Sequence, residues 1–406
     1  MALGMVLSMV TSVLIAQANT NTIITGKLAQ AGGDNAGTSA AATPVAAVTA
    51  AKPFDIVWSG LWPCCAGQSS FNLSKFPVLQ EKRLAILDTQ FGLYEQSFPP
   101  LGLPQTVDLA AHKAKVAHDA AHDGGGGRNV RGGIIPAGKD MYCCIDWESY
   151  TPVIFDHGTA AHSGGCPGPY SRYSQPGSAC TMFNTVMNAS VALVRQKAPG
   201  LNTSAAAALA AAEFNAAAKA FWLATIEVAQ STRPDCHWGF YGKPETEDIV
   251  PPFVDAFDRQ VGDAFQWMFD ASTAIFPSTY MHYNSTTCRT VGGYNASTCA
   301  TYNLRYVEAI TREAQRVNAA RGPGRKKLKV LPWVWYRYIS DHLTLLEPAD
   351  MHTALAGPGL AGADGLLFYE DGLSWGPSPK QKAENKIDQE FIDEVVGPTA
   401  EALYGK

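Results

Sequence analysis

The 406-residue chain lacks the excess of basic residues that nucleic-acid-binding proteins usually carry. It holds 31 lysines and arginines against 36 aspartates and glutamates, which gives a formal net charge of −5. Charged residues make up only 17% of the chain and hydrophobic residues 46%, which is typical of a globular protein. We therefore expect no nucleic-acid partner, and the length suits a barrel-type domain of ~250 residues or more.

The chain also has no long apolar run beyond its first eighteen residues. Residues 1–18 carry no charged side chain and end in Ala16-Gln17-Ala18, a small-residue pattern typical of a signal-peptide cleavage site. A membrane anchor is the alternative, because the run is at the short limit for a span. We expect a signal peptide at 1–18, no stable membrane span after its cleavage, and a secreted or lumenal (extracellular, vacuolar or lysosomal) protein.

Aromatic and charged residues are nearly absent from residues 19–52, so this Ala/Gly/Thr-rich stretch is expected to be a disordered tether before a folded domain at 53–406. Nine cysteines follow the signal peptide, and in an oxidising compartment most should pair. Cys288 with Cys299, and Cys166 with Cys180, could each close a short loop, but the sequence does not fix the connectivity. Glycosylation sequons agree with secretion and stand at Asn72, Asn188, Asn202, Asn284 and Asn295.

Short apolar runs alternate with helical patterns through the folded region. Strands are expected at 54–58, 82–87, 141–145, 238–241, 278–281, 328–336 and 365–369, and helices at 106–118, 202–230 and 255–269. Strands separated by helices predict parallel βα units, and enough of them are present to close a barrel. The predicted fold is therefore α/β, a TIM-like (β/α) barrel that forms a single catalytic domain.

Two carboxylates stand two residues apart where an apolar strand ends, at Asp146 and Glu148. Side chains alternate along a strand, so both project from the same face. At the C-terminal end of a barrel strand they would lie where barrel enzymes keep their chemistry. Close carboxylates raise the pKa of one partner, which prepares an acid for glycosidic bond cleavage. The alternative is a solvated Asp-x-Glu at a strand end.

Aromatic residues end several of the other apolar runs. They are Tyr241, Tyr280, Trp333, Trp335, Tyr336 and Tyr369. Aromatic faces pack on the apolar faces of sugar rings, and tyrosine hydroxyls add hydrogen bonds. Ordinary core packing is the alternative for any single one, but their repetition at strand ends favours sugar binding for the set.

Seven segments of the chain, taken in order, resemble the hyaluronidases of glycoside hydrolase family 56. They are Phe54-Asp55-Ile56-Val57-Trp58, Phe91-Gly92-Leu93-Tyr94, Leu101-Gly102-Leu103-Pro104-Gln105, Ile145-Asp146-Trp147-Glu148, Trp238-Gly239-Phe240-Tyr241-Gly242, Phe276-Pro277-Ser278-Thr279-Tyr280 and Val330-Leu331-Pro332. The fourth reproduces the family's VIDWE core. The resemblance implies a distorted (β/α) barrel and endo-hydrolysis of a polysaccharide that contains N-acetylhexosamine, hyaluronan or a chondroitin-like glycosaminoglycan.

The resemblance also implies roles for individual residues. Glu148 matches the general acid/base, and Asp146 matches the carboxylate that orients the substrate's acetamido group. Tyr280 matches a tyrosine that holds this group, and the substrate-binding positions are Tyr94, Tyr241, Trp333 and Tyr369. The acetamido oxygen acts as the nucleophile, with net retention, and no metal or organic cofactor is required.

Several positions depart from the family pattern. Ser149-Tyr150-Thr151-Pro152 loses the arginine that usually follows the acid. Lys243-Pro244-Glu245-Thr246-Glu247 removes a family cysteine and adds two acids, which should repel a polyanion. No cysteine follows Cys299, so the family's bridge to the last helix cannot form as usual. These changes leave the reaction type in place and the identity of the polymer open.

Two rival functions and two weaker signals stay open. A non-catalytic carbohydrate-binding barrel would keep the aromatic residues, and a related N-acetylhexosaminidase would cut a different glycan. A chitinase-type site would need acids where Met141 and Cys144 stand, and is disfavoured. His118 and His122 have helical spacing but no third ligand, so an exposed helix end is favoured over a metal site. The run Arg325-Lys326-Lys327 with Lys329 indicates a solvated loop, or a contact with an anionic polymer.

Overall fold

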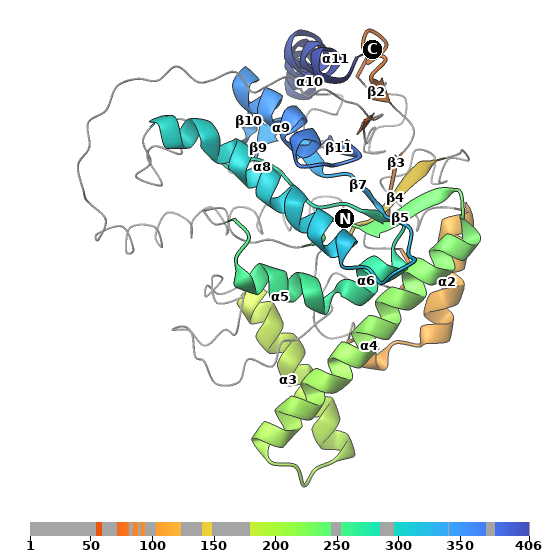
Figure 1. Cartoon of the computed structure of the whole chain (residues 1–406). Coiled ribbons are helices and arrows are strands. Elements are labelled where there is room, and N and C mark those ends of the chain that lie inside the picture. The colour runs from red at the N-terminus through yellow and green to blue at the C-terminus, as the bar shows by residue number, and fades with distance from the viewer. Residues whose placement is uncertain are drawn as a thin grey trace, which may run out of the picture.

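The computed structural model describes residues 54–58, 71–80, 84–87, 91–93, 103–122, 140–147, 179–244, 253–284, 296–339, 341–370 and 378–405. The segments interpreted as signal peptide, 1–18, and tether, 19–52, lie outside these residues. Within them the chain is α/β, with short strands gathered together and helices arranged around them (Figure 1).

The strands are short, as expected for the buried strands of an α/β protein. Their bounds are β1 Asp55–Trp58, β2 Leu79–Gln80, β3 Leu84–Leu87, β4 Met141–Ile145, β5 Cys236–Phe240, β6 Ala274–Ile275, β7 Lys329–Val330, β8 Trp333–Trp335, β9 Arg337–Tyr338, β10 Asp341–Leu345 and β11 Gly365–Tyr369. Every residue of β4 and of β8 is buried, so these strands are apolar along both faces.

The helices are longer and occupy most of the remaining chain. They are the 3-10 turn η1 Pro104–Thr106, α2 Leu109–His122, α3 Ala179–Lys197, α4 Thr203–Thr232, α5 Ala256–Ala264, α6 Gln266–Ala271, α8 Ala296–Ala319, α9 Pro348–Leu360, α10 Pro379–Phe391, the π-helical turn η5 Ile392–Val396 and α11 Gly397–Tyr404. Helices α3 and α4 lie side by side and extend away from the strands (Figure 1).

Parallel pairing connects most of the strands. The order β3-β4-β5 forms one sheet, β6-β7 a second and β2-β1-β11-β8 a third. Single bridges join Tyr241 to Phe276 and Ser278 to Trp333, which link the three sheets into one continuous series. No pairing joins β2 to β3 within the described residues, so the structure supports a parallel α/β arrangement without showing a closed barrel.

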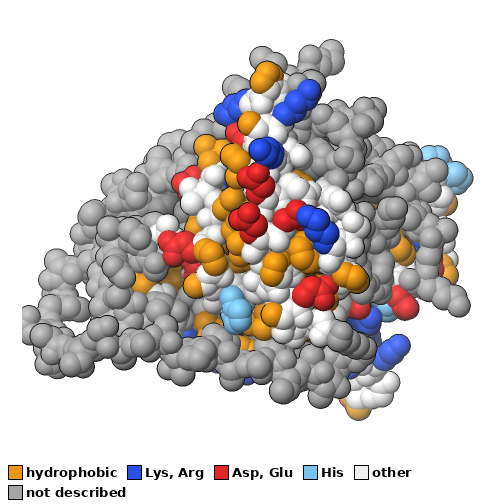
Figure 2. All heavy atoms as spheres, turned by 90° about the horizontal axis from the view of Figure 1, so that it is seen from above, with side chains coloured by type: hydrophobic (Ala, Val, Ile, Leu, Met, Phe, Trp, Pro, Cys, Tyr) orange, Lys and Arg blue, Asp and Glu red, His pale blue; other side chains and the backbone are white. Residues whose placement is uncertain are grey.

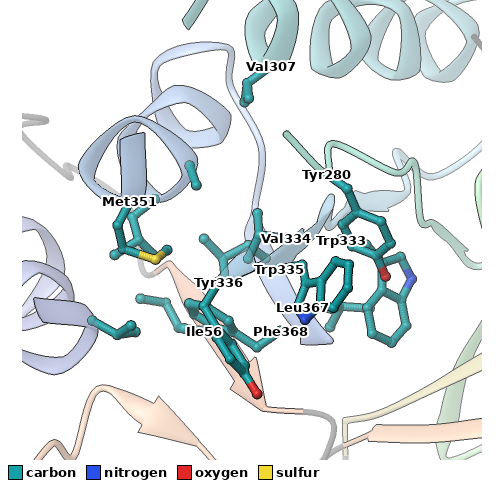
Figure 3. Packing of buried hydrophobic residues seen from close by; sticks show 14 of the residues in the cluster. Ile56, Tyr280, Val307, Trp333, Val334, Trp335, Tyr336, Met351, Leu367 and Phe368 are labelled. Atoms are coloured by element: carbon teal, nitrogen blue, oxygen red, sulfur yellow. The ribbon is translucent and has the colours of Figure 1, made fainter. Parts of the chain in front are cut away.

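Two hydrophobic clusters surround this series of strands, and alternate side chains of β4 divide between them. One contains the side chains of β1, β8 and β11 together with those of α8, α9 and α11. The other lies between β4 and β5 and the helices α2, α4 and α6. Figure 3 shows the alternation on β8 within the first cluster: Trp333 and Trp335 lie with Tyr280, while Val334 and Tyr336 point to the opposite side.

Helix α4 illustrates how the sequence sets local structure. Its interior is rich in alanine, the strongest helix former, and Asn202 caps its first turn by accepting a hydrogen bond from the Ala205 amide at 2.9 Å. The predicted helix at 202–230 is confirmed, with an end two residues later. The predicted helix at 255–269 is two helices, α5 and α6, that meet at Phe265.

The prediction of a strand at 278–281 is wrong. The regular strand β6 ends at Ile275, and only Ser278 of the predicted stretch forms a bridge. Pro277 lacks an amide hydrogen, so it cannot continue the hydrogen-bonded ladder. Pro332 interrupts the predicted strand at 328–336 in the same way, leaving β7 and β8 as two pieces.

No helix in the described part of the chain is long and apolar enough to cross a membrane.

Candidate functional site

The end of β4 directs Asp146 to the face of the strand that carries Tyr142 and Cys144. Tyr142 and Cys144 of β4 belong to the cluster that contains β1, β8 and β11. The intervening side chains belong to the opposite cluster, and they are Met141, Cys143, Ile145 and Trp147. Asp146 follows the first set by alternation, and its amide donates to the Leu87 carbonyl at 2.8 Å. The β3–β4 pairing thus extends to this residue and fixes its position.

Trp147 anchors the end of β4 on the opposite face of the strand, that of Cys143 and Ile145. Its ring stacks on Phe221 at a centroid distance of 5.3 Å and meets Trp222 edge-on at 5.3 Å, both on α4. The ring is buried, with 2% of its surface exposed. Aromatic pairs of this kind contribute ~0.5–1.5 kcal/mol each beyond the area they bury. The packing of Trp147 therefore holds the end of β4 in the orientation that directs Asp146 to the face opposite Trp147.

Four predicted site residues come together at the C-terminal ends of the strands. The Tyr241 ring lies 6.2 Å from that of Tyr280 and 5.9 Å from that of Trp333, measured between centroids. Tyr369 lies 5.7 Å from Tyr280 and 6.5 Å from Trp333. Tyr241 follows β5, Tyr280 follows β6, Trp333 begins β8 and Tyr369 ends β11, so the convergence depends on the fold and not on proximity in sequence.

A close approach between strands permits this convergence. Gly239 of β5 lies against β6, and a Cβ atom there would stand 2.5 Å from the Ala274 carbonyl oxygen. No side chain other than hydrogen fits at that distance. Glycine thus allows Tyr241, two residues further along, to reach Tyr280.

Burial raises the pKa of the Tyr280 hydroxyl well above its usual range. Neighbouring groups add to the effect: the interactions with Tyr241 and Tyr369 raise the pKa further, and so does the negative charge of Asp146. The phenol stays protonated at working pH and can donate a hydrogen bond. The Tyr241 amide donates to the Ile145 carbonyl at 2.9 Å, so Asp146, the next residue of the chain, follows at the strand end that adjoins Tyr241.

The indole N–H groups of Trp333 and Trp335 are buried and have no hydrogen-bond partner among the described residues. A buried donor without a partner costs about 1–3 kcal/mol, so such groups are rare and usually meet a ligand or water. Both rings border Tyr280 or Tyr241. The arrangement presents unused donors beside tyrosine side chains, which suits a ligand rich in hydroxyl and carbonyl oxygens.

Tyr94 and Glu148 lie outside the described residues, but the segment before Tyr94 is held firmly. The Leu93 amide donates to His112 Nδ1 at 3.0 Å, and the Gly92 amide donates to the buried carboxylate of Asp119 at 2.8 Å. Gly92 has φ +68°, and a Cβ atom there would contact the His112 ring at 2.5 Å. Helix α2 therefore sets the path of the chain that leads to Tyr94.

His112 has a defined hydrogen-bonding pattern and a shifted pKa. Nδ1 accepts from Leu93, so Nε2 is assigned as the donor to Thr225 Oγ1, 2.8 Å away, whose hydroxyl donates to the Phe221 carbonyl. Burial, opposed by a backbone hydrogen bond and reinforced by Lys113 and Lys115, lowers the pKa of His112 to about 4. The imidazole is neutral at neutral pH.

A disulfide joins Cys143 of β4 to Cys236 of β5, with the Cα atoms 5.8 Å apart. This pairing was not predicted, because the two cysteines are 93 positions apart and only the fold makes their strands neighbours. Cys299 is also disulfide-bonded, and the side chain of its partner is not described. Of the cysteines considered for local loops, Cys166 and Cys288 lie outside the described residues, and Cys180 lies on α3 with its side chain not described. The bridge ties together the two strands that carry Asp146 and Tyr241.

The weaker sequence signals do not join the site. The prediction of an exposed helix end at His118 and His122 is confirmed: both are exposed on α2 and their rings stack at 4.8 Å. Among the described residues no group of three or more His, Cys, Asp and Glu side chains could hold a metal ion. Lys329 is not purely solvated, since its ammonium contacts Asp55 Oδ2 at 3.2 Å.

Sequence reasoning missed two contributors to the site's surroundings. Ser278 lies within 3.5 Å of the Tyr241 hydroxyl, and His342 stacks near Trp335. The repeated tryptophan of Trp333-Val334-Trp335 was the available signal for a second ring on the same face. Tyr336, in contrast, points away: it packs near Trp58, and its hydroxyl lies 3.4 Å from Asp388.

Comparison with known proteins decides the family. A family model described as hyaluronidase, glycoside hydrolase family 56, matches residues 182–399, more than half of the chain. The chain belongs to the hyaluronidase family. Among curated relatives, a honeybee (Apis mellifera) hyaluronidase is 27% identical over 265 residues, covering 64% of this chain. Human hyaluronidase-1 is 25% identical over 370 residues, covering 86% of this chain and 73% of the human protein.

This hyaluronidase-family chain spans 58% of the length of the honeybee and hornet (Dolichovespula maculata) relatives it matches. Its fold is similar to the crystal structure of bee venom hyaluronidase, with a TM-score of 0.62 and 20% identity over 86% of this chain and 99% of that one. A second bee venom structure, in complex with a hyaluronic acid tetramer, gives the same TM-score at 19% identity.

Proposed function

We propose that the protein is an endo-acting glycoside hydrolase that cleaves hyaluronan or a chondroitin-like glycosaminoglycan at its N-acetylhexosamine residues. The observation that carries the proposal is the convergence of Asp146 with Tyr241, Tyr280, Trp333 and Tyr369. Parallel strands of barrel enzymes keep catalytic groups at this end. The family membership agrees with the chemistry, and the tetramer bound to the bee venom enzyme supports the choice of polymer.

Each residue has a role in the proposed mechanism. The substrate's acetamido oxygen attacks the anomeric carbon as the glycosidic C–O bond breaks, and Glu148 protonates the leaving oxygen. Asp146 stabilises the positive charge that develops on the acetamide nitrogen, and the protonated Tyr280 hydroxyl holds the acetamido group. Glu148 then removes a proton from the water that opens the cyclic intermediate, and the configuration is retained overall. The alternation of side chains along a strand predicts that Glu148 projects from the same face as Asp146.

We also propose that the strands complete a distorted (β/α) barrel. Support comes from the opposite, N-terminal end of the strands, where Asp55 of β1, Tyr142 of β4 and Lys329 of β7 meet. The Tyr142 hydroxyl donates to Asp55 Oδ2 at 2.5 Å, and the Lys329 ammonium donates to the Tyr142 oxygen at 2.9 Å. These strands are not neighbours in any sheet. Side chains of three such strands meet naturally across the interior of a barrel.

Secretion and a single catalytic domain at 53–406 complete the proposal. Three sequon asparagines, Asn72, Asn188 and Asn202, are exposed, which an oligosaccharide acceptor requires. The Cys143–Cys236 bridge agrees with folding in an oxidising compartment. The signal peptide at 1–18 and the tether at 19–52 remain predictions from the sequence.

The charge distribution bears on the choice of polymer. Figure 2 shows a face on which acidic and basic side chains are interspersed with hydrophobic ones, so this face is not a positive surface suited to a polyanion. Arg325 and Arg321 lie beside Asp270, which offsets part of the basic run near 325–329. We therefore place recognition in the aromatic site, with sugar-ring contacts contributing more than long-range attraction.

The proposal is tested by the release of reducing-end N-acetylhexosamine from hyaluronan and chondroitin. Wild type, Glu148→Gln and the control Glu394→Gln, an exposed carboxylate at the C-terminal end of the fold, are compared across pH ~4 to ~8. We expect release by wild type and the control, and a loss on the order of 10²–10⁴-fold for Glu148→Gln. Equal release by all three proteins would remove Glu148 from its role.

Two alternatives give different results in the same experiment. A non-catalytic carbohydrate-binding barrel would release nothing, yet would bind the polymers equally well as wild type and as Glu148→Gln. An N-acetylhexosaminidase for another glycan would cleave neither polymer but would cleave less acidic N-acetylhexosamine polymers. The presence of both a carboxylate, Asp146, and a protonated tyrosine, Tyr280, favours catalysis over binding alone, because binding of a sugar does not require this combination.

A further inference from the structure

The hairpin formed by β9 and β10 follows directly after β8, which carries Trp333 and Trp335. Its strands pair antiparallel, with Asp341 opposite Tyr338 and Leu345 opposite Arg337. The Leu346 amide closes the base of the hairpin by donating to the Tyr336 carbonyl at 2.9 Å. The hairpin therefore starts and ends beside the aromatic site.

The side chain of Arg337 hydrogen-bonds the backbone of this hairpin. Its Nη1 donates to the Leu343 carbonyl at 2.9 Å and to the His342 carbonyl at 3.3 Å, and its Nη2 forms an ion pair with Asp388 of α10. Arg337 and Asp388 are both buried, and charge-assisted hydrogen bonds in such surroundings are strong and directional. The backbone of His342 is thus fixed relative to the core, and this sets where its side chain begins.

The imidazole of His342 lies against Trp335. Their centroids are 6.4 Å apart and their planes differ by 20°, within the range of offset aromatic pairs. Trp335 in turn lies 6.0 Å from Tyr280 and 5.7 Å from Tyr369. The rings thus form a row that leads from the proposed catalytic position outward to a half-exposed histidine.

Both outer rings of this row retain hydrogen-bonding capacity. The Trp335 indole N–H is buried without a partner among the described residues, and no described residue hydrogen-bonds the ring nitrogens of His342. An aromatic face next to an unused donor is the arrangement that binds a pyranose, whose C–H face packs on the ring while its hydroxyl or carboxylate oxygens accept the hydrogen bond.

We propose that Trp335 and His342 form an outer subsite that binds a further sugar unit of the same polysaccharide, next to the unit held by Asp146 and Tyr280. The inference rests on the proposed function, because it identifies part of the substrate surface of the same site. The subsite contributes binding for long substrates only. Among the described rings His342 contacts Trp335 and neither Tyr280 nor Tyr369, so its loss affects KM and leaves kcat unchanged.

The test uses the full chain with one short and one long hyaluronan oligosaccharide. For His342→Ala we expect KM of the long oligosaccharide to rise ~3- to 10-fold, as loss of one aromatic contact implies, with kcat and the short oligosaccharide unaffected. His342→Tyr restores a ring and should recover most of the affinity. Trp335→Phe, which keeps the ring and removes the N–H, should raise the same KM.

The matched control is Leu343→Ala, which removes the neighbouring side chain of the same hairpin, 67% exposed and without a ring contact to Trp335. We expect it to behave as wild type. Equal KM values for wild type, His342→Ala and Trp335→Phe on the long oligosaccharide would overturn the subsite. A fall in kcat on the short one would also overturn it, because His342 would then act on the catalytic position.

Failure of the proposed function gives a separate result. If wild type cleaves no polymer, the same oligosaccharides are titrated by calorimetry against wild type and His342→Ala. Weaker binding of the long oligosaccharide by the variant would then uphold the subsite on a binding protein. Equal affinity, or no binding by wild type, would reject the subsite.

Discussion

The two ends of the strands use similar residues for different purposes. At the N-terminal end, Tyr142 donates to Asp55 and accepts from Lys329, so each polar group is satisfied by another. At the C-terminal end, Tyr280 is equally buried, but two neighbouring indole N–H groups have no partner among the described residues. Polar groups at the first end bind each other, and donors at the second end remain available.

We propose that this difference separates residues that stabilise the fold from residues that bind a ligand. A hydrogen-bonded cluster that is complete contributes to the free energy of unfolding and offers little to a substrate. A cluster with unused donors costs stability and is expected where function requires it. We therefore assign the cluster of Asp55, Tyr142 and Lys329 to stability, and the cluster of Asp146, Tyr280 and Trp333 to substrate.

The largest expected effect comes from replacing the carboxylate after β4, and the control replaces the carboxylate before it. Asp146→Asn removes the charge proposed to stabilise the acetamide, and turnover should fall on the order of 10²–10³-fold with little change in Tm. Asp140→Asn is the matched control: it lies just before the same strand with φ +58°, a conformation that asparagine tolerates. Turnover is measured on both variants. An equal loss in the two would contradict the distinction between the two ends of the strands.

A second prediction concerns His112, which orders the segment leading to Tyr94. Its pKa is about 4 when folded and 6.5 in its ordinary state, so below pH 6.5 the unfolded chain binds a proton that the folded chain does not. Stability from this group is complete above pH 6.5 and falls as pH drops toward 4, by about 2–3 kcal/mol. Denaturant unfolding of wild type at pH 7 and 4.5 should show this loss.

The control for His112 lies on the same helix. His112→Gln should be less stable than wild type at pH 7 because the hydrogen bonds to Leu93 and Thr225 are perturbed, but it should lose less stability on acidification. His122→Gln, an exposed position, should follow the wild-type pH dependence. An unchanged acid response in His112→Gln would contradict the assignment of a neutral buried imidazole.

The smallest expected effect is that of Tyr142→Phe at the stabilising end. It removes two hydrogen bonds while Asp55 and Lys329 still contact each other at 3.2 Å, so we expect a loss of about 1–2 kcal/mol in the free energy of unfolding. The kcat on hyaluronan should not change. A fall in kcat with unchanged stability would reverse the assignment of the two ends.

Much of the fold could be predicted from local patterns. The strands at 141–145 and 365–369 have the predicted bounds, because each is a buried run bordered by polar or turn residues. The predicted strand at 278–281 was wrong because Pro277 cannot donate a hydrogen bond and so ends the ladder. The prediction relied on the residues after this proline and did not take its effect into account. The hairpin of β9 and β10 was not predicted, since its few residues lack a turn signature and it depends on Arg337 and Asp388.

The site was less accessible to sequence reasoning than the strands. Tyr241, Tyr280, Trp333 and Tyr369 were predicted, and the structure brings them together. The pairing of Cys143 with Cys236, and the contact of His342 with Trp335, depend on which strands become neighbours. No spacing along the chain encodes that information.

The most direct test of the account is the anomeric configuration of the reducing end that the enzyme first produces, followed by NMR on whichever of hyaluronan and chondroitin is cleaved. Attack by the substrate's own acetamide, supported by Asp146 and Tyr280, predicts that the first-formed product retains the configuration of the bond cleaved. A first-formed product of inverted configuration would contradict the account, because it would require water to attack directly with a second carboxylate as its base.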